Sequence, residues 1–154
     1  MILSDNFNLK EFTKSATALR LEINNKPDVD AINNIQILVD NLLQPLRDKL
    51  GPIRITSGYR NQELCLAIGS SKRSQHTKGQ AVDIQYFKNN KMNNKILMRA
   101  IIEHGDFDQL INEFNYSWIH VSYKCAGNRN QILKAYKENN KTVYADITNQ
   151  YNAI

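Results

Sequence analysis

The sequence has no long apolar run and few cysteines, and these shortages exclude several classes of protein. Its apolar stretches are only a few residues long, whereas a membrane-spanning helix needs about 20. Residues 1–5 lack the basic start and apolar run of a signal peptide, so we expect synthesis in the cytoplasm with no export route of its own. Cys65 and Cys125 are too few for a disulfide framework or a four-cysteine zinc site, and we expect both to be small buried apolar residues.

Internal repeats, low-complexity tracts and blocks of like charge are also missing. The 154 residues are 42% hydrophobic and 23% charged, which fits one folded domain. Twenty basic and 15 acidic residues give a net charge of +5, which favours an anionic partner such as nucleic acid, a membrane surface or a cell-wall polymer. Because the basic residues are scattered and form no stripe, we expect neither nucleic acid nor a membrane as partner.

Helical patterns dominate the first third of the chain. We expect a short helix over residues 8–18, because Asn8 and Glu11 have the spacing of a capping box. Residues 28–50 place apolar side chains three and four positions apart, which predicts a helix lying on a core. Pro45 should kink that helix near its end.

The remaining elements are mostly short strands. We expect strands over 53–56, 81–86, 107–114 and 117–123, a helix over 93–103, a tail hairpin within 131–147 and a frayed end from 149. If Asn115 and Tyr116 form a two-residue turn, Glu113 pairs with Trp118 and Ile111 with His120. These expectations define an α+β fold, with a small mixed or antiparallel sheet flanked by helices.

Three residues have the chemistry of a catalytic zinc site. His76 lies where a polar loop enters a predicted strand, Asp83 lies on the polar face of that strand, and His120 lies on the polar face of another. A catalytic zinc needs three such ligands and one open position for water. From the residues alone the alternative stays open, because lone histidines are more often structural and a single aspartate often caps a turn.

Four motifs in order resemble those of a known family. They are Ser57–Arg60; Ser74–His76 with Gly79, Ala81 and Asp83; Asp108–Ile111 with Glu113; and Trp118–Ser122. This arrangement resembles the zinc D-alanyl-D-alanine carboxypeptidase-like peptidases, including phage endolysins and, more distantly, the hedgehog signalling domain. The resemblance covers about residues 4–135 of a single 1–154 domain and leaves the tail from about 136 unmatched.

The resemblance implies one zinc ion, held by His76, Asp83 and His120, and peptidoglycan stem peptides as substrate. Many relatives carry the catalytic acid three positions before the last histidine, but here that position is Ser117, which cannot act as a base at neutral pH. We expect Glu113 to replace it, since the hairpin register puts Glu113 diagonal to His120 at about 7 Å. The alternative for Glu113 is a solvated strand residue paired with a lysine.

The resemblance also suggests residues that contact the substrate. The family's matching arginine implies that Arg60 binds a substrate carboxylate or stabilises the oxyanion. Ser74 and Gln75 would donate hydrogen bonds to the peptide, and Trp118 would wall the pocket, unless it is simply core. We expect Asp108 to be structural, or to accept a ring N–H from a zinc histidine.

Two functions follow from these expectations. The first is a zinc peptidase acting on peptidoglycan as a phage lysin or virion enzyme, made in the host cytoplasm and released to the cell wall or packed with other virion proteins. The second is a non-catalytic structural or wall-binding phage component of the same fold. This alternative stays open because Ser117 stands at the position where many relatives carry the catalytic acid. The sequence leaves open whether the D-Ala–D-Ala or the L-Ala–D-Glu bond is cut.

Overall fold

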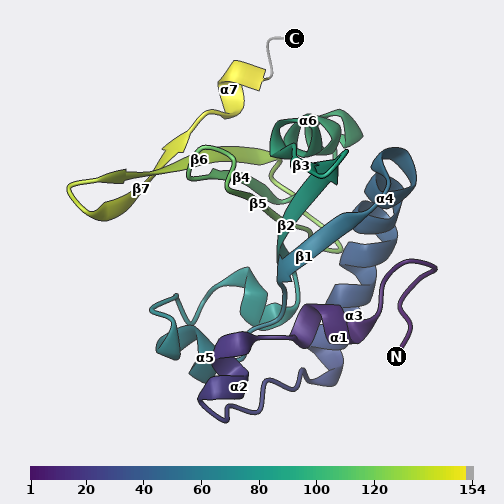
Figure 1. The fold of residues 1–154 in the computed structure, drawn as a ribbon, viewed down its shortest axis with the longest axis vertical. Helices are drawn as coiled ribbons and strands as arrows, with labels where there is room; N and C mark the ends of the chain where they lie inside the picture. Colours follow the sequence, from purple (N-terminus) through teal and green to yellow (C-terminus); the bar gives the residue numbers. More distant parts are fainter. Residues whose placement is uncertain (152–154) are drawn as a thin grey trace.

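A mixed β-sheet forms the centre of the molecule in the computed structural model, which describes residues 1–151 (Figure 1). Within this part of the chain the seven strands are β1 (Ile53–Ser57), β2 (Ala81–Lys88), β3 (Lys91–Met92), β4 (Gln109–Glu113), β5 (Trp118–Ser122), β6 (Gln131–Glu138) and β7 (Lys141–Asp146). Their order is β1-β2-β5-β4-β6-β7, with β3 paired to β2. Only β4 and β6 run parallel among the paired strands of residues 1–151. The predicted α+β class with a mixed sheet is therefore confirmed.

Helices flank this sheet. They are α1 (Leu9–Thr13), α2 (Ala16–Arg20), α3 (Val29–Leu38), the π-helical η1 (Val39–Leu43), α4 (Gln44–Leu50), α5 (Gln62–Ala67), the 3-10 helix η2 (Gln75–Lys78), α6 (Asn94–His104) and α7 (Thr148–Tyr151). Helix α6 packs on β2 and β5 and also contacts α4. None of the helices within residues 1–151 is both long and apolar enough to cross a membrane.

The two faces of the sheet differ as the sequence pattern predicts. Val82 and Ile84 of β2 and Ile119 and Val121 of β5 are fully buried in the hydrophobic core. Because side chains alternate along a strand, Asp83 lies on the opposite face. That face, turned away from α6 and the core, carries the polar residues of interest.

The predicted helix over residues 8–18 is wrong in extent, although its start is right. Asn8 and Glu11 form the expected capping box. The helical path then ends at Lys14, and Ser15 starts α2 by accepting a hydrogen bond from the backbone N–H of Ala18. A serine that bonds the backbone favours a new N-cap over a continuous helix.

The helix expected over 28–50 is present as α3, η1 and α4 in succession. A π-helical turn over Val39–Leu43 directly precedes α4, and Pro45 lies in the first turn of α4. The kink expected at Pro45 stays a prediction. Because the backbone stays helical through Leu43 and Gln44, Pro45 lies within a continuous helical path, where it cannot donate to a carbonyl of the preceding turn and crowds that carbonyl. A π-helical turn is a distortion that commonly accompanies such an interruption.

The hairpin of β4 and β5 has the predicted register but a different turn. Glu113 faces Trp118 and Ile111 faces His120, as expected. The connection, however, comprises four residues, 114–117, and Phe114, Asn115 and Tyr116 all have positive φ angles of 46, 57 and 65°. The predicted two-residue turn is therefore wrong. Three successive left-handed residues take up the two extra positions without shifting the strand pairing.

The tail forms the predicted hairpin, as β6 and β7, and joins the main sheet by pairing β6 with β4. Figure 1 shows this hairpin projecting from the rest of the molecule, at the left of the view. The expected fraying from residue 149 is wrong for 149–151, which belong to α7, while 152–154 lie outside the described residues. Cys65 is buried as expected, but Cys125 is exposed, in the irregular segment that precedes β6.

Candidate metal centre and active-site cleft

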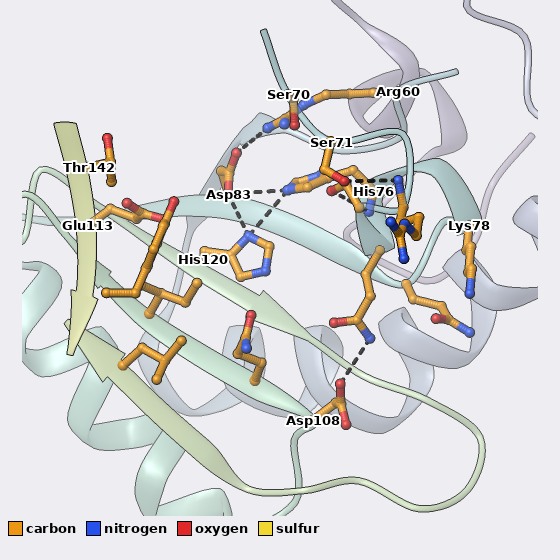
Figure 2. Close-up of a pocket in the computed structure, with 18 of the residues that line it drawn as sticks. Arg60, Ser70, Ser71, His76, Lys78, Asp83, Asp108, Glu113, His120 and Thr142 are labelled. Carbon is orange, nitrogen blue, oxygen red and sulfur yellow. Dashed lines mark hydrogen bonds and ion pairs between the residues drawn. The ribbon is translucent and has the colours of Figure 1, made fainter. Parts of the chain in front are cut away.

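Strand pairing brings two of the three predicted ligands together. Asp83 on β2 lies directly opposite His120 on β5, and the carboxylate Oδ1 is 3.0 Å from His120 Nδ1. His76, on η2, places its Nε2 3.2 Å from His120 Nδ1 and 3.5 Å from Asp83 Oδ1. Each residue thus offers one ligand atom, and the three atoms lie within 4.8 Å of one another (Figure 2).

A hydrogen bond at Nδ1 of His76 determines which of its two ring nitrogens carries the proton. Nδ1 lies 2.7 Å from the backbone oxygen of Gly58, and because a carbonyl only accepts, Nδ1 carries the proton. Burial lowers the pKa of His76, despite the opposing effect of Asp83, so the ring is neutral. Its Nε2 therefore presents a lone pair to the other two ligands, which is the form that binds a metal.

Asp83 is held as an ionised carboxylate. Burial by itself raises the pKa of Asp83, but hydrogen bonding, above all with His120, outweighs it and holds that pKa far below its usual range. The guanidinium of Arg60 donates to Oδ2, the oxygen that faces away from the histidines, and its Nε donates to Ser57 Oγ. Arg60 therefore orients Asp83 so that Oδ1 stays available.

This donor set fits a zinc ion. The lone pair of His76 Nε2 and the ionised Oδ1 of Asp83 lie 3.5 Å apart, and both lie within hydrogen-bond distance of His120 Nδ1. The three atoms therefore converge on one point, where either a shared proton or a cation satisfies them. Two imidazoles and one carboxylate are ligands that zinc prefers, and three protein ligands leave one position open for chemistry. Gly58 and Arg60 supply the outer contacts that usually orient such ligands.

Glu113 lies beside the predicted ligands, diagonal to His120 on the same face of the sheet. Glu113 as a residue is 7% exposed, and no cation within the described residues pairs with it. Burial raises the pKa of Glu113, Asp83 raises it further, and His120 and Arg60 oppose both. The alternative of a solvated glutamate paired with a lysine does not describe this residue.

These residues line one cleft of about 1040 Å³. Figure 2 shows Glu113 on one side of His120, with His76 and Lys78 on the other. Basic side chains also line the cleft, from Arg73, Lys78, Lys124 and Arg129.

The predicted substrate-contacting residues line the cleft too, but the protein itself engages them. Ser74 Oγ accepts the backbone N–H of His76, and Gln75 Nε2 donates to Asp108 at 3.0 Å. Trp118 is half-buried and packs against Phe114, with ring centroids 5.3 Å apart. Their contacts with a substrate stay predictions.

Asp108 has the structural role that was one of its two expected roles, and it does not accept a ring N–H from a ligand histidine. The carboxylate accepts instead from Gln75, from Arg129 and from Lys124, at 2.7 to 3.0 Å. Burial raises the pKa of Asp108, but these hydrogen bonds outweigh it and lower the pKa to about 2. The acceptor for a ligand ring is the backbone oxygen of Gly58, which residue types do not reveal because every residue has one.

The tail adds residues that sequence reasoning left out of the site. Leu133 of β6 and Thr142 and Tyr144 of β7 line the cleft on the side of Glu113. The sequence predicted the tail hairpin itself. It gave no local pattern to indicate that β6 would pair with β4 and so bring these residues to the cleft.

A mixed sheet that presents two histidines and an aspartate around one point, with a buried glutamate in the same cleft, has the composition of a metal-hydrolase site. A family model, Peptidase M15, matches residues 5–122. The chain therefore belongs to this family of zinc-dependent metallopeptidases of the DD-carboxypeptidase type. No curated protein matches the chain. The family match ends at the last residue of β5, so β6 and β7 lie beyond it.

Proposed function

We propose that this protein is a zinc peptidase that hydrolyses an amide bond in the stem peptides of bacterial peptidoglycan. The observation that carries this proposal is the meeting of His76, Asp83, His120 and Glu113 in one cleft of an M15 family member. We further propose that it acts as a phage lysin or virion enzyme, made in the host cytoplasm and acting at the cell wall. Other virion proteins are its candidate partners.

In this proposal His76, Asp83 and His120 hold one zinc ion. Zinc supplies Lewis-acid chemistry, because it acidifies water to a pKa of about 7 and polarises the scissile carbonyl. The strands β2 and β5 keep two of the ligands at a fixed separation, because the two residues are direct partners in the sheet. Ligands on rigid elements hold the geometry that such a site needs.

Glu113 serves as the general base and then as the general acid. Its carboxylate takes a proton from the attacking water and passes it to the leaving amine. Burial in the cleft raises its pKa, which makes it a better base than a solvated glutamate. Glu113 lies diagonal to His120 on the same face of the sheet, so its carboxylate would face a water held beside the three ligands.

Arg60 and the rim residues recognise the substrate. Arg60 lines the cleft beside Asp83, so a planar guanidinium is available near the reacting carbonyl for the oxyanion or a substrate carboxylate. Ser74, Gln75 and Trp118 would contact the peptide. The net charge of +5 would favour residence on an anionic cell wall.

A second candidate is a non-catalytic wall-binding component of a phage particle. It is favoured by Ser117, which stands where many relatives carry the acid and whose hydroxyl donates to the backbone oxygen of Phe114. Zinc binding and peptidoglycan binding without turnover would distinguish this candidate from the enzyme.

The test combines metal analysis with digestion of defined muropeptides. We expect one zinc per chain and release of peptide fragments, whose masses identify the bond cut. His120→Ala should lose both zinc and turnover, whereas Glu113→Gln should keep zinc and lose at least about 100-fold in kcat. Glu103→Gln is the matched control, since Glu103 is an exposed glutamate paired with Lys49 on α4. If the zinc-loaded protein cleaves none of the muropeptides, the proposal that it is a peptidoglycan peptidase is refuted.

A further inference from the structure

A row of paired residues crosses four strands on the cleft face of the sheet. Trp118 of β5 pairs with Glu113 of β4, Glu113 pairs with Ala135 of β6, and Ala135 pairs with Tyr144 of β7. Directly paired residues share one face of a sheet. Tyr144 therefore lies on the face of Glu113, two strands away from it.

The residue between them is small. Ala135 is fully buried and has only a methyl group, and neighbouring strands are about 4.8 Å apart. A tyrosine side chain can cross such a gap toward the cleft. Consistent with this, Leu133, Thr142 and Tyr144, which all share this face, line the cleft, and Figure 2 shows Thr142 and Glu113 on the same side of it.

The phenol of Tyr144 belongs to a residue that lines the same cleft as Glu113, Asp83 and His120, and it is accessible. Burial raises the pKa of Tyr144, and the negative charges of Glu113 and Asp83 raise it further. The hydroxyl therefore stays protonated at neutral pH and acts as a hydrogen-bond donor. The residue is nevertheless 53% exposed, which leaves it available to a ligand in the cleft.

We propose that Tyr144 is a substrate-positioning residue, whose hydroxyl donates a hydrogen bond to a carbonyl oxygen of a peptide bound between Glu113 and the β6–β7 hairpin. This inference rests on the proposed peptidase function. The hairpin lies beyond the family match at residues 5–122. Tyr144 thus gives this chain a wall of the cleft that the matched segment does not contain, and with it a determinant of which peptides fit.

The chain offers a matched control in Tyr136. It lies on β6 next to Ala135 in sequence, so it points to the opposite face of the same hairpin, and it is also partly exposed, at 36%. The two variants Tyr144→Phe and Tyr136→Phe each remove one hydroxyl from the same hairpin. Neither change alters the ring that packs there.

The experiment measures kcat and KM on a defined stem peptide, and the dissociation constant of that peptide, for both zinc-loaded variants. We expect Tyr144→Phe to lower kcat/KM and weaken binding about tenfold, the usual effect of one lost hydrogen bond, with zinc content unchanged. Tyr136→Phe should match the wild type in every measurement.

Equal kinetics and binding for Tyr144→Phe and the wild type would overturn the inference. A wild type that binds the peptide without cleaving it would refute the proposed function, while a tenfold weaker binding by Tyr144→Phe would still support the role of Tyr144. A wild type that neither binds nor cleaves stem peptides would refute both.

Discussion

Asp83 and His120 lie directly opposite each other on the antiparallel strands β2 and β5, with Oδ1 and Nδ1 3.0 Å apart. This pairing builds the centre of the site into the sheet itself. Because side chains alternate along a strand, a slip of one residue would turn His120 into the hydrophobic core. Burial of Val82 and Ile119 on the other face therefore fixes the register that the site requires.

The contact between Arg60 and Asp83 predicts a role in metal affinity. Arg60→Met removes the donor on Oδ2 of Asp83, so we expect zinc affinity to fall about 10-fold to 100-fold, as for other residues that orient a ligand. Competition titration with a zinc chelator measures it. Arg73→Met, at another cleft-lining arginine, should leave the affinity unchanged. If Arg60→Met binds zinc as tightly as the wild type, Arg60 does not orient the ligand Asp83, and only its proposed role in substrate binding remains.

The buried position of Glu113 predicts the pH at which kcat/KM falls on the acid side of its pH profile. A general base must be ionised, so activity falls as pH drops through its pKa. Burial raises the pKa of Glu113, and we expect that limb to lie above the value of about 4.3 for a free glutamate. Measuring kcat/KM between about pH 4 and pH 8, with zinc content checked at each pH, tests this. A limb at or below the ordinary value would contradict the assignment.

Gly79 and Gly69 offer a test of how closely the loop before β2 packs on α3. Both have positive φ angles, 70 and 69°, but a Cβ on Gly79 would lie 2.3 Å from the backbone oxygen of Ala31, whereas one on Gly69 would meet no described atom within 4 Å. Gly69→Ala should lower the free energy of unfolding by about 1 kcal/mol from backbone strain alone. Gly79→Ala should lower it by roughly 2–4 kcal/mol, since the clash adds to the strain.

Urea denaturation measures both variants. Equal losses for the two alanines would show that the loop moves freely away from α3. That result would also contradict the idea that packing against α3 holds η2, and therefore His76, in position.

Asp108 predicts a loss of stability in acid. Its pKa is about 2 in the folded protein, below the value of about 3.9 for an unfolded aspartate. The stabilisation is therefore complete above about pH 4 and is lost as pH falls toward 2, with a size of roughly 2 kcal/mol.

The measurement compares the free energy of unfolding of the wild type and Asp108→Asn across this pH range. The difference between them should shrink as pH falls. Asp5→Asn, at an exposed position outside the helices, is the control and should show no such trend. A constant difference for Asp108→Asn would show that its contacts to Arg129 and Lys124 do not depend on its charge.

The sequence by itself determined the elements that depend on local chemistry. Alternating side chains placed Asp83 and His120 on polar faces, the capping box started α1 at Asn8, and the spacing of Glu113 and Trp118 set the hairpin register. These features rest on residues close in the chain, where periodicity and capping act directly.

Only the tertiary structure decided how the elements meet. The pairing of β2 with β5, the contact of His76 with the Gly58 oxygen, and the addition of β6 and Tyr144 beside β4 all join segments distant in sequence. The division of the first helix at Ser15 and the hydrogen bonds of Asp108 belong to the same group. Such contacts are selected by the burial and hydrogen bonding of the whole chain, which no local pattern records.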